Sequence, residues 1–141
     1  MTTCLSLDAT DDDLRFFAEK WAERLSAEQY ADAFDMLMHR PERPAKSWCS
    51  SADELRAWVE GYGTDDPDPD EVRHKVTPID RATADAPLQR VIRGVPLYLG
   101  FVARLDYWLP MDGEWSDLMA SIDFVNEDSQ LVPVLIALRV P

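Results

Sequence analysis

The sequence has few of the residues that most often build metal, redox and phosphate sites. Among 141 residues there are two cysteines, two histidines and five glycines. Cys4 and Cys49 have no motif spacing, which favours a reduced, cytoplasmic setting over a disulfide scaffold. His39 and His74 have no second ligand at the usual spacing, so we expect no metal site. The glycines are scattered and form no phosphate-binding loop, so we expect no cofactor.

The chain also lacks a long apolar run and an excess of positive charge. No apolar stretch reaches the roughly 20 residues that span a bilayer. Residues 1–13 carry no basic side chain, so we expect no signal peptide. With 27 acidic and 14 basic residues, the net charge is −13, which repels nucleic-acid backbones and anionic lipid. We therefore expect neither nucleic acid nor a membrane as a partner.

Apolar residues are abundant enough to form one folded core. Hydrophobic residues make up 46% of the chain and aromatic residues 10%, which at this length predicts a single domain over residues 1–141. We expect a helical part at about 11–62, an acidic connection at 64–71 and a sheet part at 72–140. The connection holds four aspartates and two prolines, residues that are typical of turns and loops.

The helical part shows three helix starts of the capping-box type. Each places a hydroxyl side chain three residues ahead of an acid or amide: Thr10 with Asp13, Ser26 with Gln29, and Ser51 with Glu54. Apolar residues then recur at intervals of three and four, which predicts three short amphipathic helices, with Gly61 as the cap that ends the third. The main apolar stripes are Leu14/Phe17/Trp21/Leu25, Tyr30/Phe34/Leu37 and Leu55/Trp58/Val59.

The second half is typical of strands joined by tight turns. Alternating patterns and apolar runs predict strands at 72–76, 89–93, 97–109, 114–125 and 131–140. Asp112–Gly113 is a strong hairpin signal, and residues 126–129 predict a second turn. Gly100 offers a place for a kink in the long strand. Helices followed by strands favour an α+β fold in which helices pack on one face of an antiparallel sheet.

Four segments together carry a resemblance to a known family. They are the Phe17/Trp21/Leu25 helix, the Tyr30/Phe34/Leu37 helix, the Leu55–Trp58 helix with Gly61–Gly63, and the final hairpin with Trp115–Phe124. Their order, over residues 12–140, resembles the NTF2-like superfamily, the cone-shaped α+β roll also found in SnoaL-like cyclases and ketosteroid isomerases. The resemblance implies a strongly bent sheet of the cystatin-like kind. In the enzymes of that superfamily, a pocket acid abstracts a proton.

Two strand carboxylates are the candidate catalytic residues. Asp106 shares one side of its strand with Arg104 and Trp108, and Asp117 follows Trp115 on the next strand. If this polar side lines the mouth of a roll, either aspartate could act as a general base. If it faces solvent, the aspartates are ordinary cross-strand charges, which is the reading that half-solvated antiparallel sheets favour. A register change of one residue would exchange the two faces.

The candidate ligand-binding residues are aromatic or cationic. A pocket acid could recruit Tyr30, Tyr62 or His74 as its partner. Tryptophans near strand ends can line a pocket, whereas helical core spacing favours burial. The full set is Tyr30, Trp58, Tyr62, His74, Arg104, Trp108 and Trp115.

Three functions are compatible with the sequence. The absence of a catalytic motif favours a non-catalytic NTF2-like module that binds a small apolar ligand or a protein partner. One alternative is a small SnoaL-like enzyme of the isomerase, cyclase or hydratase type, with a strand carboxylate as general base. The other is an acidic immunity or antitoxin-like protein that binds a basic toxin through charge. Residues 132–140 are apolar on both sides of a strand, so we expect both sides to be covered and the chain to form a homodimer.

Overall fold

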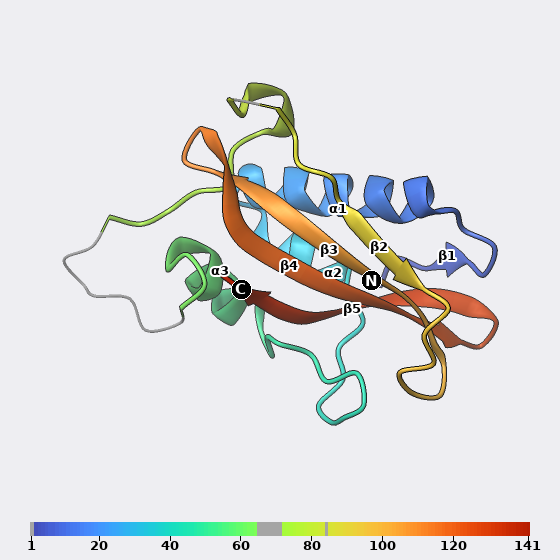
Figure 1. Cartoon of the computed structure of the whole chain (residues 1–141). Helices are drawn as coiled ribbons and strands as arrows, with labels where there is room; N and C mark the ends of the chain where they lie inside the picture. Colours follow the sequence, from blue (N-terminus) through green and yellow to red (C-terminus); the bar gives the residue numbers. More distant parts are fainter. Residues whose placement is uncertain (1, 65–71, 84) are drawn as a thin grey trace.

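The structure is a computed structural model, and it describes residues 2–64, 72–83 and 85–141. Within these residues, three helices pack on one face of a curled, five-stranded antiparallel sheet with the order β1-β5-β4-β3-β2 (Figure 1). The chain therefore has the α+β fold that its helix and strand patterns predict. Its elements are β1 (Leu5–Ser6), α1 (Asp11–Ser26), α2 (Tyr30–Asp35), α3 (Ala52–Glu60), the 3-10 turn η1 (Ile79–Arg81), β2 (Arg90–Arg93), β3 (Phe101–Met111), β4 (Glu114–Glu127) and β5 (Gln130–Arg139).

Two of the three predicted helix caps are confirmed. The Asp13 N–H donates to Thr10 Oγ1 at 3.2 Å, and the Thr10 N–H donates to Asp13 Oδ2 at 2.8 Å, which completes a capping box for α1. The Glu54 N–H donates to the Ser51 hydroxyl oxygen at 3.0 Å at the start of α3. The predicted cap at Ser26 is wrong, because α1 continues through this residue and its hydroxyl donates to the carbonyl of Glu23 at 2.8 Å.

The predicted strands differ from the observed ones at two places. The predicted 72–76 strand is reduced to an isolated bridge between Val76 and Met111, and Val72 at its start is exposed. The predicted 97–109 strand begins only at Phe101. Gly100 has a φ of +90°, which turns the chain there and leaves Leu99 fully exposed. The acidic connection at 64–71 lies, apart from Thr64, outside the described residues.

Both predicted turns are confirmed as tight hairpins. Asp112 and Gly113 join β3 to β4, and Asp128 and Ser129 join β4 to β5. All four residues have positive φ values between 52° and 91°, which suits the right-handed twist of the strands that they connect. The hairpins place three long strands side by side, and these strands form the body of the sheet.

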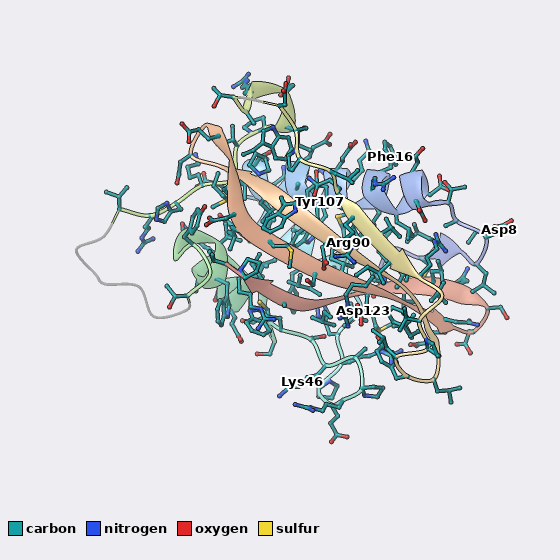
Figure 2. The ribbon with its side chains drawn as sticks, viewed as in Figure 1. Asp8, Phe16, Lys46, Arg90, Tyr107 and Asp123 are labelled. Carbon is teal, nitrogen blue, oxygen red and sulfur yellow. The ribbon has the colours of Figure 1, made fainter. Side chains whose placement is uncertain are left out.

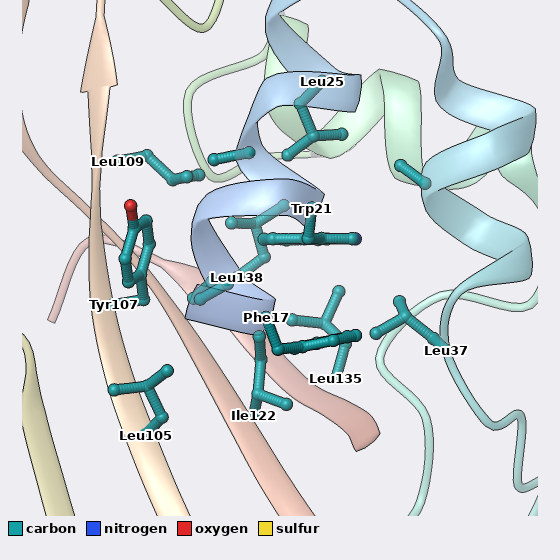
Figure 3. Packing of buried hydrophobic residues seen from close by; sticks show 14 of the residues in the cluster. Phe17, Trp21, Leu25, Leu37, Leu105, Tyr107, Leu109, Ile122, Leu135 and Leu138 are labelled. Carbon is teal, nitrogen blue, oxygen red and sulfur yellow. The ribbon is translucent and has the colours of Figure 1, made fainter. Parts of the chain in front are cut away.

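The core fills the space between α1 and the sheet. Phe17, Trp21 and Leu25 of α1 belong to one buried cluster with side chains of β3, β4 and β5 (Figure 3). The Phe17 ring contacts the Phe124 ring edge to face, with centroids 5.8 Å apart. Trp21, Tyr107 and Phe124 are among the largest fully buried side chains. The inner side of the curled sheet is therefore packed with side chains.

The outer face of the sheet, which points away from the helices, has a smaller apolar cluster over β5. Val125, Val132 and Val134 are buried there beneath Ala45 and beside Met38. This confirms that the last strand is covered on both faces. The cover comes from the chain's own loop, so burial of β5 requires no second copy, and self-association stays a prediction.

Candidate functional site

A groove with a volume of about 770 Å³ lies on the helical side of the molecule. Hereafter it is called the α1–α2 groove. Its walls come from β1, α1, α2 and the residues next to them. The apolar side chains of Leu5, Ala9, Phe16, Phe17 and Met36 line it. Phe16 points out of α1 at the edge of the molecule (Figure 2) and is 58% exposed, which is unusual for so large an apolar side chain.

Charged residues surround this apolar lining. Lys20 lies one helical turn after Phe16, and its Nζ atom is 5.2 Å from the centre of the Phe16 ring. Arg24 also lies on the α1 wall, whereas Asp32 and Asp35 lie on the α2 wall. Asp13 adds an acidic side chain to the α1 wall. The groove thus combines an apolar floor with charged side chains of both signs around it, an arrangement suited to a mainly apolar molecule that carries a polar group.

The two predicted catalytic carboxylates lie on β3 and β4, away from this groove. Asp106 is half-buried on the outer face and accepts a hydrogen bond from the Ser121 hydroxyl at 2.9 Å. Asp117 is exposed and accepts a hydrogen bond from the Tyr62 hydroxyl at 2.6 Å. Neither carboxylate lines the α1–α2 groove. The polar side of β3 points away from the helices, because Leu105 and Tyr107 fill the opposite side.

Three of the predicted site residues meet near the β3–β4 hairpin. Tyr62 contacts Asp117 through its hydroxyl, and its ring centre lies 5.0 Å from that of His74. His74 Nδ1 in turn lies 2.6 Å from Asp112 Oδ2. Burial, followed by the hydrogen bond to Asp117, raises the pKa of Tyr62. These contacts tie the end of α3 and the segment at 72–78 to the hairpin.

The remaining predicted residues lie apart from one another. Tyr30 is buried, the guanidinium of Arg56 lies over its ring at 5.7 Å, and burial raises its pKa to about 12. Trp58 packs against the Trp48 ring at 5.0 Å, which fits its helical core spacing. Trp108 and Trp115 are half-buried on neighbouring strands, and neither lines the α1–α2 groove.

Arg104 forms the most buried ionic contact that we find in the described residues. Its Nε and Nη2 atoms donate to the two oxygens of Asp123 at 2.7 Å and 3.1 Å, in a bidentate pair. Tyr98 donates its hydroxyl to the same carboxylate at 2.6 Å. Asp123 is only 1% exposed, whereas the Arg104 side chain is 29% exposed. Arg104 and Asp123 lie opposite each other on β3 and β4, so they form a cross-strand charge pair.

Metal-binding clusters, membrane spans and similarity to known proteins give no further indication of function in the described part of the chain. Within residues 2–64, 72–83 and 85–141, no three histidine, cysteine or acidic side chains gather in a way that could hold a metal ion. No helix in the described part of the chain has the length and apolar character of a transmembrane span. The chain matches no family model, no curated protein and no solved structure. Function is therefore inferred from the side chains and clefts themselves.

All four tyrosines are expected to ionise late in the folded protein. Burial is the main cause that raises the pKa of Tyr30, Tyr62, Tyr98 and Tyr107 above its ordinary value. A raised pKa means that the folded state favours the neutral tyrosine. The free energy of unfolding therefore has its full value below about pH 10 and falls as the pH rises towards the folded-state pKa values. Tyrosinate absorbance should stay absent up to about pH 10 in the folded chain but appear near pH 10 in urea. A folded-state tyrosine that ionises at its ordinary pKa would contradict this.

Proposed function

We propose that this chain is a non-catalytic binding module whose ligand, a small and mainly apolar molecule, lies in the α1–α2 groove. The groove volume of about 770 Å³ is within the range of small-molecule sites, which is about 300–1,000 Å³. The exposed ring of Phe16 at its edge carries the proposal, because a ligand that covers this ring removes apolar surface from water. A protein segment is the alternative occupant, and the concave shape favours the small molecule.

We further propose that the module is of the NTF2-like kind. A curled antiparallel sheet with few helices on one face is compatible with such a roll. The sequence favoured a ligand inside the roll. Trp21, Tyr107 and Phe124 fill the space between α1 and the sheet, so the proposed site is the α1–α2 groove instead. The enzymatic alternative has less support, because Asp106 and Asp117 do not line the groove.

Titration with Nile red, a neutral fluorescent probe of apolar sites, tests the proposal. The methionine methyl NMR signals report where the probe binds, because Met36 lines the groove, Met111 is buried in the core and Met119 lies on β4 outside the groove. We expect saturable one-to-one binding with a shift of the Met36 signal and unchanged Met111 and Met119 signals. No shift at Met36, or an equal shift at Met119, would contradict the proposal.

A matched pair of variants sharpens this test. Phe16→Ala and Leu99→Ala each remove a large exposed apolar side chain, but only Phe16 lines the groove. We expect Phe16→Ala to weaken Nile red binding about tenfold, from the lost apolar contact of the ring. Leu99→Ala should leave the affinity unchanged. Equal effects of the two substitutions would indicate general surface adsorption and would exclude the groove as the site.

A further inference from the structure

A second cleft lies on the outer face of the sheet, beneath the loop at 43–48. It has a volume of about 390 Å³ and is hereafter called the loop cleft. The loop is fixed to β5 because the Trp48 N–H donates to the carbonyl of Leu135 at 2.8 Å and Ala45 is buried against the valines of the outer face. In Figure 2, Lys46 on this loop and Phe16 on α1 lie on opposite sides of the sheet. The loop cleft is therefore separate from the α1–α2 groove.

The loop cleft is locally positive in a strongly acidic chain. Arg43, Lys46 and Arg104 line it, and Asp123 is the one acidic residue among its described lining side chains. Arg104 already neutralises that carboxylate. Arg43 and Lys46 form no ion pair with any residue that the structure describes. Two cations are thus left uncompensated at the cleft, although the whole chain has a net charge of −13.

Arg104 is held in place by its contacts with a buried carboxylate. Its Nε and Nη2 atoms are fixed by Asp123, which Tyr98 also holds through a hydrogen bond. The Nη1 atom makes no hydrogen bond to another described residue. Asp106 is the other carboxylate that acts on Arg104 electrostatically, and it accepts a hydrogen bond from Ser121. A guanidinium whose orientation is already fixed loses little conformational entropy when it binds an anion.

Apolar side chains complete the lining of the loop cleft. Trp48 and Ile136 are both half-buried there and leave part of their surface open to the cleft. An inorganic anion would leave these surfaces exposed to water, whereas a flat apolar ring could cover them. The combination of a fixed guanidinium and two further cations with an indole ring therefore favours an anionic group attached to a ring.

We propose that the loop cleft binds a small aromatic carboxylate. The carboxylate accepts hydrogen bonds from Arg104 Nη1 and from Lys46 or Arg43, and the ring packs on Trp48 and Ile136. This site is independent of the α1–α2 groove, and its ligand differs from the groove ligand in charge. Charge-assisted hydrogen bonds from a guanidinium to a carboxylate are among the strongest polar contacts that proteins make.

Titration with benzoate, followed by calorimetry and by the indole N–H NMR signal of Trp48, tests the proposal. We expect saturable one-to-one binding, a shift of the Trp48 signal and no shift of the Met36 methyl. The double substitution Arg43→Ala with Lys46→Ala should weaken binding about tenfold or more, because it removes both side chains that could supply the second charge-assisted contact, together with their two positive charges. Both side chains are exposed, so this variant should stay folded, which circular dichroism verifies. Added salt should weaken the binding.

Three controls separate the proposal from simpler explanations. Arg139→Ala removes one positive charge from an exposed position outside the loop cleft and should change the affinity less than about twofold. Benzyl alcohol keeps the ring without the charge, and acetate keeps the charge without the ring, so both should bind much more weakly than benzoate. Equal binding of either control compound, an Arg139→Ala effect as large as that of the double variant, or absence of benzoate binding would overturn the proposal. Each of these results leaves the Nile red test unaffected.

Discussion

Phe17→Ala is expected to lower the free energy of unfolding by about 4 kcal/mol, because the substitution opens a cavity in the core. Phe17 is 4% exposed, and its ring contacts Phe124 of β4 edge to face. The neighbouring Phe16 is 58% exposed on the same helix, so Phe16→Ala should change the same free energy by less than about 0.5 kcal/mol. Urea denaturation followed by circular dichroism measures both values.

Both substitutions replace phenylalanine by alanine in α1, so they change the helix propensity by the same amount. Any difference between them therefore reports the packing of α1 on the sheet. If Phe17→Ala does not fold, Phe17→Leu keeps the comparison measurable, with an expected loss of about 1 kcal/mol for a partly refilled site. Similar losses for Phe16→Ala and Phe17→Ala would show that α1 does not pack on the sheet through the Phe17 side.

The same contrast explains why the helical half of the fold could be predicted. Apolar residues recur in α1 at the period of a helix, so Phe17, Trp21 and Leu25 had to share one face. Local capping signals at Thr10 and Ser51 also hold, because they need only residues close in sequence. Ser26 shows the limit of such signals. A hydroxyl can bond to the preceding helical turn as readily as it caps the next helix, and the sequence alone does not distinguish the two.

Register explains why the polar contacts of the sheet were harder to predict. Next to the hairpin, Pro110 pairs with Trp115. If the same register continued along β3 and β4, Arg104 would lie opposite Ser121. A bulge between Trp108 and Pro110 shifts the pairing by two residues, so that Arg104 faces Asp123. No pattern in the sequence marks this bulge. The predicted alternation of faces survives, because a shift of two residues preserves the face on which each side chain lies.

The α1–α2 groove was missed for a different reason. Its lining comes from β1, α1 and α2, and no sequence pattern joins these segments before the chain folds. One signal was available, because Phe16 lies outside the apolar stripe of its helix and is surrounded by charged residues.

Asp123→Ala is expected to lower the free energy of unfolding by about 3 kcal/mol, since it leaves two donors without the acceptor that they share. Arg104 and Tyr98 both bond to this carboxylate, which is 1% exposed. Asp106→Ala serves as the control on the same face. Asp106 is half-buried and has one hydrogen bond, to Ser121, so its loss should cost less than about 1 kcal/mol. Equal losses for the two substitutions in urea denaturation would contradict a special role for the buried carboxylate.

Asp123→Asn distinguishes the charge from the shape of the side chain. The amide keeps the volume and one acceptor oxygen, so it should cost less stability than Asp123→Ala does. Burial and then the contact with Asp123 raise the pKa of Tyr98. Removing the negative charge should therefore lower the pKa of Tyr98, while burial keeps it above the ordinary value. Tyrosinate absorbance should appear at lower pH in Asp123→Asn than in the parent protein, and Tyr98→Phe should abolish this difference. These two results together would support the conclusion that one carboxylate orders both Arg104 and Tyr98. An unchanged titration would separate Tyr98 from the ion pair.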